Sequence, residues 1–485
     1  MRLLLLGLLL IGTVRAQVSP YPFYDIQKQS DGQENFMTIL NSGLASYVKR
    51  INLIRKAKDS IELEYYVFNK DFSGKVLIQE LVKAVNRGVK VRLLIDNSVA
   101  AVKFDRYDAE VLIENGINFK FYNSASNFRL SAIQYRNHRK VFIIDNMEAI
   151  VGGRNISDKY YEISREENYL DRDIFVTGPI VKTIKESFNK YFNNQISNTP
   201  KLPKSYKVQP RNYFKKKNLA MELLVLSQSD QQKLVDLELL GNMLLSRTTP
   251  YICPVTTFST DRPGATPTSG AKPNYSNKFR YLRKTIQEKV AETNKRLTIE
   301  SPYFLTTRAT RKILRDLNSK GVDIKVYTNS LGSSSQLYIS SNLYSDIKKL
   351  LKIGIDLNLH QGSYYERNAI YDPEVKKSKW GIHSKTILFE SDDNKEFMIG
   401  SYNIDNRSSF FNTELGLFCK GSDDLFEVVQ DDIENRINKG MKVISKQEAK
   451  DNETNEPANI YGYWSEKLIK MKILTLPFRL IRFLL

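Results

Sequence analysis

One pattern occurs twice in this chain, about 235 residues apart. Residues 59–98 and residues 295–331 each begin with an apolar stretch that ends in aromatic residues. Each continues through a polar turn into an amphipathic stretch, and then through Arg-Gly-Val or Lys-Gly-Val into a second apolar stretch. This order predicts strand, helix and strand, and therefore a right-handed crossover in a mostly parallel sheet. Because the offset is far too long for a solenoid repeat, we interpret the pattern as a duplicated α/β domain.

The composition is compatible with two such domains. The chain has 485 residues, of which 41% are hydrophobic and 11% aromatic, so it can bury a substantial core. These values exclude a disordered tail protein, a collagen and a polytopic membrane protein. The two cysteines, Cys253 and Cys419, are too few for a disulfide framework and lack the spacing of a metal site. With only three histidines, the chain also has no histidine-rich metal site.

The two ends of the chain carry targeting or membrane patterns. Residues 1–16 combine Arg2, a short apolar run and small residues at a cleavage spacing, which predicts a secretory signal peptide. An uncleaved anchor or a short buried helix is the alternative. Residues 461–485 carry apolar side chains at helical spacing beside lysines and arginines. This tail is either an interfacial membrane helix or a terminal helix docked on its own domain.

The segments between the repeats have the composition of connectors. Residues 200–218 and 254–274 are predicted to be loops, with a helical connector over residues 219–245. The predicted organisation is a signal peptide over residues 1–16, a first domain over 17–200, a linker region over 201–275, a second domain over 276–440, and a polar linker with a basic amphipathic tail over 441–485.

The formal net charge of +19 calls for an anionic partner, either phospholipid headgroups or nucleic acid. The apolar and basic tail favours lipid. We therefore expect an exported protein, periplasmic or extracellular, that is peripherally associated with a phospholipid membrane. Nucleic acid is the alternative partner. We also expect a monomer in which the two domains pair within one chain.

A second string is repeated after each copy of the first pattern. It reads HRKVFIIDNMEAIVGGRN in the first half and HSKTILFESDDNKEFMIGSYN in the second. Alternation along a strand predicts that the histidine and lysine share one face, and that a hairpin returns the asparagine beside them. The residues singled out are His138, Lys140, Asp145, Gly152, Gly153 and Asn155 in the first string, and His383, Lys385, Gly400, Ser401 and Asn403 in the second.

These residue types suit chemistry at a phosphate group. A histidine can attack phosphorus and form a covalent intermediate. Lysine and asparagine side chains can stabilise charge on the phosphate oxygens, and small residues let the backbone approach them. Two copies supply one histidine for attack and one to protonate the leaving oxygen and later activate the acceptor. This chemistry requires no cofactor and no metal ion. The third histidine, His360, is expected to be a core residue.

The two strings resemble the paired HKD motifs of the phospholipase D superfamily. Stretches such as NHRKVFIID, VGGRNISDKYY and GSYNIDNRSSFFNTELGL are similar, more narrowly, to the bacterial cardiolipin synthase C-type branch. The resemblance covers roughly residues 40–435. It implies two duplicated α/β domains with mixed, mostly parallel sheets, related by a pseudo-twofold axis and sharing one active site. It also implies a phosphohistidine intermediate in reactions of phosphodiesters.

The resemblance also implies roles for residues outside the two strings. Asp173 and Glu414 match acids that orient the histidines, and Arg407 and Ser408 match an Arg-Ser step. The implied catalytic set is His138, Lys140, Asp145 and Asn155 from the first half, with His383, Lys385 and Asn403 from the second.

The second motif departs from the expected pattern at its acid. Glu390 stands at the regular spacing from His383, whereas Asp393 stands at the regular spacing before Gly400. Either residue can be the displaced acid, and both can instead be simple turn residues. Because the first motif is intact, we expect His138 to be the nucleophile and His383 the acid and base.

Three functions are compatible with these patterns. The favoured one is an enzyme that transfers or hydrolyses phosphatidyl groups at a membrane surface. A secreted nuclease of the same superfamily would benefit equally from the basic charge. A catalytically silent lipid-binding protein is suggested only by the irregular acid of the second motif. The sequence leaves open whether water or an alcohol accepts the phosphatidyl group.

Overall fold

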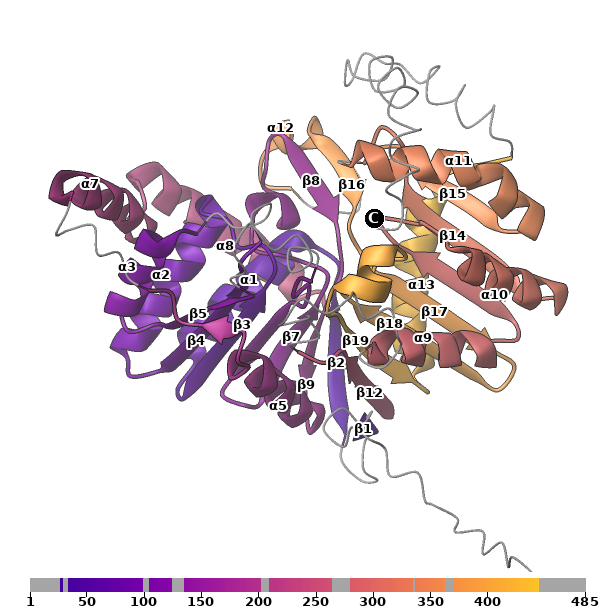
Figure 1. Ribbon diagram of the computed structural model, residues 1–485, viewed down its shortest axis with the longest axis horizontal. Helices are drawn as coiled ribbons and strands as arrows, with labels where there is room; N and C mark the ends of the chain where they lie inside the picture. The colour runs from indigo at the N-terminus through magenta and orange to yellow at the C-terminus, as the bar shows by residue number, and fades with distance from the viewer. Residues whose placement is uncertain are drawn as a thin grey trace, which may run out of the picture.

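The fold consists of two halves, each built on a nine-stranded sheet (Figure 1). The predicted signal peptide and the C-terminal tail lie outside the part of the chain that the structure describes. Among the described helices, none is long and apolar enough to cross a membrane. The computed structural model describes residues 27–28, 34–98, 104–123, 135–201, 209–263, 280–334, 336–362 and 370–444.

The first sheet contains a parallel unit followed by antiparallel strands. Its central strands β3, β4 and β5 are parallel to one another, and every other pair in the sheet is antiparallel. The strands are, in spatial order, β10 (Ser197–Asn198), β5 (Asn118–Tyr122), β4 (Lys90–Asp96), β3 (Ser60–Tyr65), β6 (Val141–Ile144), β7 (Glu148–Gly152), β9 (Asp173–Thr177), β2 (Asn35–Leu40) and β11 (Tyr251–Cys253).

The second sheet repeats the first strand for strand and with the same pairing directions. Its order is β20 (Met441–Lys442), β15 (Asp356–His360), β14 (Asp323–Asn329), β13 (Arg296–Glu300), β17 (Thr386–Ser391), β18 (Asn394–Gly400), β19 (Leu415–Lys420), β12 (Val255–Thr260) and β1 (Gln27–Lys28). The predicted duplication and the mixed α/β sheets are confirmed. Parallel pairing, however, is limited to three strands of each sheet.

Helices cover the outer face of each sheet (Figure 1). The helix α2, for example, starts after Asp71, whose side chain accepts a hydrogen bond from the backbone N–H of Gly74. It buries Val76, Leu77 and Leu81 at helical spacing against the sheet. The outer helices are α1 (Gly43–Lys56), α2 (Phe72–Asn86) and α3 (Arg106–Glu114) on the first sheet, and α9 (Tyr281–Glu292), α10 (Arg308–Ser319) and α11 (Leu337–Ile353) on the second.

The two halves share a core that lies between their sheets. Side chains of β6 and β7, such as Val141 and Val151, belong to the same buried cluster as Phe397 and Ile399 of β18. Residues of α5 (Ile180–Phe192) and α13 (Asp423–Asn438) complete this cluster. A further short parallel ladder joins β8 (Glu167–Leu170) of the first half to β16 (Lys379–Ile382) of the second. The halves are therefore packed together by apolar burial and by backbone pairing.

The region predicted to be a linker is more structured than its composition suggests. The loop predictions for residues 200–218 and 254–274 are wrong in part. Pro210 occupies the first turn of helix α7 (Pro210–Met221), where its missing N–H costs no hydrogen bond, and β12 joins the second sheet. The predicted helical connector is interrupted after α7 by η2 (Glu222–Leu224), and helix α8 (Gln228–Leu245) then packs on α1.

A disulfide joins the two halves. Cys253 of β11 in the first sheet is bonded to Cys419 of β19 in the second. Two cysteines are too few for a framework of several bridges, but they are enough for this single one, which was not predicted. The pairing depends on the strand order, which brings together residues that are 166 positions apart in the chain.

Candidate active site

Both motif histidines lie at the junction of the two halves. Each donates a hydrogen bond from its backbone N–H to a carbonyl oxygen of the opposite half. His138 donates to Thr413 at 3.0 Å, and His383 donates to Leu170 at 2.8 Å. His138 and His383 precede β6 and β17 and do not lie on these strands. The prediction that the histidine and lysine lie on a strand is therefore wrong, because the segment before each strand carries them.

His138 is oriented by a carboxylate from the other half. Its Nδ1 lies 3.0 Å and 3.1 Å from the two carboxylate oxygens of Glu414, and 3.1 Å from the carbonyl oxygen of Ser401. Because all of these neighbours are acceptors, Nδ1 carries the proton and Nε2 keeps its lone pair. Glu414 also accepts hydrogen bonds from the hydroxyls of Ser401 and Ser408. The structure thus places Glu414 where the sequence analysis expected a histidine-orienting acid.

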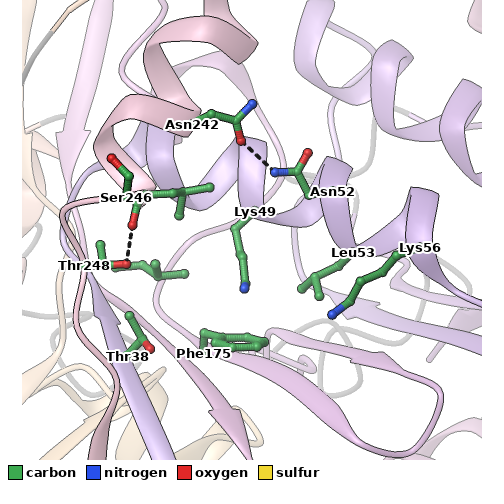
Figure 2. A pocket seen from close by; sticks show the side chains of 11 residues that line it. Thr38, Lys49, Asn52, Leu53, Lys56, Phe175, Asn242, Ser246 and Thr248 are labelled. Atoms are coloured by element: carbon green, nitrogen blue, oxygen red, sulfur yellow. Dashed lines mark hydrogen bonds between the residues drawn. The ribbon is translucent and has the colours of Figure 1, made fainter.

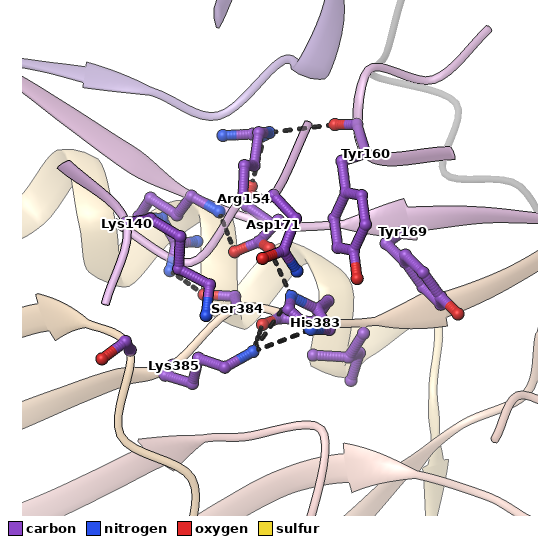
Figure 3. Close-up of polar contacts among 12 residues, drawn as sticks. Lys140, Arg154, Tyr160, Tyr169, Asp171, His383, Ser384 and Lys385 are labelled. Atoms are coloured by element: carbon purple, nitrogen blue, oxygen red, sulfur yellow. Dashed lines mark hydrogen bonds and ion pairs between the residues drawn. The ribbon is translucent and has the colours of Figure 1, made fainter. Parts of the chain in front are cut away.

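His383 is oriented in the same way by Asp171, not by the predicted Asp173 (Figure 3). The His383 Nδ1 lies 2.6 Å from Asp171 Oδ2. Asp173 instead accepts hydrogen bonds from Ser46 at 2.7 Å and Arg50 at 3.0 Å, both in the first half. The assignment of Asp173 as a histidine-orienting residue is therefore wrong.

Asp171 could have been found by aligning the two halves from a different landmark. Asp171 and Glu414 stand the same number of residues before Gly178 and Gly421, which begin the turns into α5 and α13. Both glycines have positive φ, so they are fixed points of the fold. Two acids in one LDRDIF string made the choice ambiguous without this landmark.

The two lysines lie beside the histidines. The Lys385 ammonium is 3.0 Å and 3.2 Å from the two ring nitrogens of His383 (Figure 3). Lys140 and Lys385 each donate to the carbonyl oxygen of the histidine two residues earlier. The charge of Lys385 lowers the pKa of His138, and that of Lys140 lowers the pKa of His383, so both halves act on one site.

Burial controls the protonation of these four side chains. It lowers the pKa of His138 to about 4 and that of His383 to about 3, so both imidazoles are neutral near pH 7. It also lowers the pKa of Lys140 to about 7 and that of Lys385 to about 8. A bound anion would reverse these shifts, because a neighbouring negative charge favours the cationic forms.

Small residues make room for the neighbouring chain segments, one of which carries Asp171. A Cβ on Gly153 would lie 2.2 Å from Asp171 Oδ1, and a Cβ on Gly152 would lie 2.2 Å from Asp173 Oδ1. At Gly400 a Cβ would lie 2.2 Å from the carbonyl oxygen of Leu415. The glycines therefore bring the hairpins close to β9 and β19. Their part in the site is to admit the neighbouring chain.

The motif asparagines are held by neighbouring backbone and hydroxyl groups. Asn155 Oδ1 accepts from the backbone N–H of Val67 at 3.2 Å, and Asn155 also bonds the Tyr160 hydroxyl. Asn403 donates its backbone N–H to Ser408, and its side chain is 5% exposed. Within the described residues, Asn403 Oδ1 has no hydrogen-bond partner.

The predicted motif acids lie elsewhere. Asp145 binds the backbone N–H groups of Lys58, Asp59 and Ser60 at 2.8–2.9 Å and so fixes the turn before β3. Burial raises its pKa, but these three hydrogen bonds outweigh that effect and leave the pKa lowered. Glu390 forms an ion pair with Lys295 at 3.0 Å. The prediction that Asp145 and Glu390 are catalytic residues is therefore wrong.

The third of these acids, Asp393, lies in the turn between β17 and β18. Glu390 is the positional counterpart of Asp145, because it pairs with Arg296 of β13 where Asp145 lies beside Ser60 of β3. Neither second-half acid contacts a histidine. The interpretation as a turn residue is therefore confirmed for Asp393, whereas Glu390 lies within strand β17.

Aromatic rings and a buried cation surround the site. Tyr66 packs edge-on against His138 at 5.1 Å between ring centroids, and Tyr160 against His383 at 4.9 Å. Arg172 lies beside Asp171 in sequence and forms ion pairs across the junction with Glu300 at 2.7 Å and Asp432 at 2.6 Å. Sequence reasoning missed Arg172, because its partners come from the other half.

The remaining residues named from the sequence are Arg407, Ser408 and His360. Arg407 and Ser408 belong to a single π-helical turn, η4 (Arg407–Phe411), and Ser408 donates to Glu414 at 2.7 Å. His360 is buried on β15, with its Nδ1 3.0 Å from the Tyr327 hydroxyl, in keeping with a core residue. Among the described residues, no group of histidine, cysteine and carboxylate side chains is arranged to hold a metal ion.

Comparison with known proteins identifies the family. The model described as "Cardiolipin synthase, PLD-like domain" matches residues 50–194 and 286–437, which include both motifs. The chain belongs to this family. It is therefore an enzyme of the phospholipase D superfamily, as its HKD-like strings indicated.

Individual relatives agree with this assignment. The chain is 30% identical to an uncharacterised protein of Helicobacter pylori over 395 residues, which is 78% of this chain and 74% of that protein. It is 27% identical to cardiolipin synthase C of Escherichia coli over 394 residues, 78% of this chain and 80% of that protein. The solved structure of a phosphatidylserine synthase from Haemophilus influenzae superposes with a TM-score of 0.62, at 16% identity, over 95% of this chain and 97% of that one. This superposition shows that the two proteins share a fold.

Proposed function

We propose that this enzyme is a phosphatidyltransferase that acts on membrane phospholipids through a phosphohistidine intermediate. One observation carries the proposal: each half supplies a histidine whose Nδ1 is held by a carboxylate of the opposite half. Two neutral imidazoles oriented in this way, with two lysines beside them, suit nucleophilic displacement at a phosphodiester.

His138 is the nucleophile in this proposal. Its Nδ1 is committed to Glu414 and Ser401, so the Nε2 lone pair is available. The Nε2 of His383, by contrast, is engaged by the Lys385 ammonium. Attack of His138 Nε2 forms a P–N bond, and the bond between phosphorus and the oxygen of the leaving alcohol breaks.

His383 supplies the proton that the leaving oxygen takes up. The bound phosphodiester raises the pKa of His383 from its ligand-free value of about 3, because it adds a negative charge beside the ring. In the second step, neutral His383 removes a proton from the acceptor hydroxyl, whose oxygen attacks phosphorus and breaks the P–N bond. Lys140 and Lys385 neutralise charge on the phosphate oxygens throughout.

An alcohol is the acceptor in this proposal. The support is the family model and the relatives that carry the name cardiolipin synthase. Phosphatidylglycerol can serve as both donor and acceptor, and its products separate the two outcomes. Incubation of the purified protein with phosphatidylglycerol alone should give cardiolipin and glycerol. Phosphatidic acid as the only lipid product would instead assign hydrolysis.

The proposed location is outside the cytoplasm at a membrane surface. The bridge between Cys253 and Cys419 suits an oxidising compartment, in line with a cleaved segment over residues 1–16. Helix α7 adds a surface that fits anionic lipid, because Phe214 and Leu219 are 57% and 62% exposed on a helix that is rich in lysine and arginine.

The decisive experiment compares lipid and nucleic acid substrates. Wild-type protein, His138→Ala and His383→Ala are each incubated with phosphatidylglycerol vesicles and, separately, with single-stranded DNA. Lipid turnover that disappears in both variants supports the proposal. Nucleotide release without lipid turnover contradicts it in favour of a nuclease, and turnover that survives in both variants excludes the paired-histidine mechanism.

The intermediate can be trapped directly. With phosphatidylglycerol labelled at phosphorus, rapid quenching should leave label on His383→Ala but not on His138→Ala. Label retained by His138→Ala and absent from His383→Ala would reverse the assigned roles. Release of the label in acid identifies the P–N bond of a phosphohistidine.

A further inference from the structure

A cationic cavity lies on the outer face of the first half, and neither motif histidine lines it. It has a volume of about 340 Å³ and lies between helix α1, the end of helix α8 and strands β2 and β9 (Figure 2). Lys49 and Lys56 both line it, and none of its lining residues carries a carboxylate. None of them belongs to the catalytic set.

The ammonium group of Lys49 is available for a ligand. Figure 2 shows it pointing toward the space between Thr38 and the ring of Phe175. Its nitrogen lies 3.7 Å from the centroid of the Phe175 ring. Within the described part of the chain, this ammonium has neither a hydrogen bond nor an ion pair. Its charge is therefore compensated by the face of an aromatic ring, by water and, without direct contact, by the carboxylate of Glu148.

The groups around Lys49 make the cavity suitable for an anion. The Lys56 ammonium reaches the cavity but is shared with Glu148 at 2.7 Å. The Thr38 hydroxyl lines the cavity and makes no hydrogen bond to the described residues. Burial lowers the pKa of Lys49, which shows that the cavity is partly withdrawn from solvent. An anion bound here would satisfy an incompletely paired cation in a low-dielectric place.

The volume of the cavity and its apolar walls indicate which class of ligand it can bind. Its volume falls in the lower range of sites for small organic molecules, well above the space that a single small anion requires. Leu40, Leu53 and Leu245 form apolar walls beside the two lysines. A site that is cationic at one point and apolar around it suits an anionic group attached to a hydrocarbon.

We propose that this cavity is an accessory site for the phosphate group of an anionic phospholipid, with Lys49 as its main contact. The choice of a phospholipid rests on the proposed function. The phosphate chemistry itself rests on the cavity alone. Binding here would hold the enzyme on a surface that contains its substrate, without taking part in phosphoryl transfer.

The test counts binding sites in a variant that cannot turn over lipid. His138→Ala is titrated calorimetrically with a short-chain phosphatidylglycerol below its micelle concentration, and separately with inorganic phosphate. We expect two lipid sites in His138→Ala and one in His138→Ala/Lys49→Gln, whose accessory site should be weakened about tenfold or more by loss of a charge-assisted contact. Glutamine retains part of the side-chain stem, so the packing on Phe175 is largely kept.

Lys120→Gln in the same background is the matched control. Lys120 also lies over a phenyl ring, 4.5 Å from the centroid of Phe192, but outside the cavity. Two sites retained in His138→Ala/Lys49→Gln, or an equal loss in the Lys120→Gln control, would overturn the inference. Binding of inorganic phosphate as tight as that of the lipid would assign the site to free phosphate.

The two proposals can fail separately. If wild-type protein does not turn over phosphatidylglycerol, but Lys49→Gln still abolishes phosphate binding, the proposed function fails and the accessory site stands. If turnover occurs but Lys49→Gln changes no binding, only the accessory site is wrong. Turnover of monomeric lipid by the Lys49→Gln enzyme should equal that of the wild type.

Discussion

At the scale of single residues, the site depends on two carboxylates, each of which orients the histidine of the other half. Glu414 of the second half holds His138 of the first, and Asp171 of the first half holds His383 of the second. Each acid is fully buried, so its charge must be matched by the groups that it orients. The tautomer of each histidine is therefore set only when the two halves are packed together.

Substitution of Asp171 should lower kcat, whereas substitution of Asp173 should lower stability. Asp171→Asn replaces the carboxylate beside His383 Nδ1 with a neutral amide that can present its NH2 group and favour the wrong tautomer, so we expect kcat to fall about 10²-fold or more with a small change in stability. Asp173→Asn weakens the buried ion pair with Arg50, so we expect a loss of several kcal/mol, about 3 kcal/mol, in the free energy of unfolding. Turnover assays and urea denaturation of both variants check this, and similar effects of the two on kcat would contradict it.

The lysines should make substrate binding dependent on pH. The pKa of Lys140 is lowered to about 7 and that of Lys385 to about 8, so the free enzyme loses positive charge as the pH rises through this range. KM for an anionic phospholipid should therefore rise above about pH 7 and stay level below it. KM measured from about pH 6 to pH 9 is the readout.

Arginine variants serve as the control for this pH dependence. Lys140→Arg keeps its charge over the whole range, so the part of the rise that belongs to Lys140 should vanish. A level KM in the wild-type enzyme would show that both lysines remain protonated when the site is empty.

At the scale of elements, the hairpins act as spacers for the acids. The β6–β7 hairpin ends in Gly152 and Gly153, which lie directly against the segment that carries Asp171. The corresponding β17–β18 hairpin ends in Gly400 and Ser401, and Ser401 donates to Glu414. The same motif position therefore makes room for an acid in one half and binds an acid in the other.

Gly153→Ala should displace the acid without unfolding the protein. The added Cβ would lie 2.2 Å from Asp171 Oδ1, so this carboxylate must move away from His383. A displacement of about 1 Å is expected to lower kcat about 10²-fold. Gly321→Ala is the comparison, because its Cβ would meet nothing within 4 Å and its effect should be confined to stability. Full activity of Gly153→Ala would refute the spacer role.

Helix α7 offers a second element-level test, this time of membrane contact. It packs on α3 through Tyr213 and Ala220, which leaves Phe214 and Leu219 exposed. Phe214→Ser/Leu219→Ser should weaken binding to anionic vesicles about tenfold or more, because two large apolar side chains no longer enter the interface. Met147→Ser, at a residue 65% exposed in the β6–β7 turn, is the control in a sedimentation assay with vesicles. Equal binding by all three proteins would place the membrane contact elsewhere.

At the scale of the whole molecule, the two sheets are joined by several kinds of contact. They share a buried apolar cluster, the β8–β16 ladder and the ion pairs of Arg172 with Glu300 and Asp432. The disulfide adds a covalent link between β11 and β19. Movement of one half against the other would break these contacts, which keeps the paired histidines in register.

Removal of the disulfide should lower stability more than activity. Cys253→Ser/Cys419→Ser frees a loop of 166 residues in the unfolded chain, so the free energy of unfolding should fall by about 2–4 kcal/mol. Denaturation of the variant, and of the wild type with and without a reductant, measures this. An unchanged wild-type midpoint in the reductant would show that the bridge does not contribute.

The success of the sequence analysis varied with the range of the interactions. His138 and His383 stand in repeated strings, and local pattern was enough to place both at a shared site. Asp145 and Glu390 belong to the same strings, but their backbone and ion-pair partners lie at the far ends of β6 and β17 from the histidines. A string shows which residues recur. It does not show whether a side chain supports the fold or contacts the ligand.

The sequence by itself determined the duplication, the mixed α/β sheets, the family and the two histidine–lysine pairs. All of these follow from periodicity and short motifs, which are local properties of the chain. The tertiary structure alone decided that Asp171 and not Asp173 orients His383, that Cys253 is bonded to Cys419, and that Lys49 lines a cationic cavity. These features join segments that are distant in sequence, and their contacts exist only after two sheets with the same strand order have packed against each other.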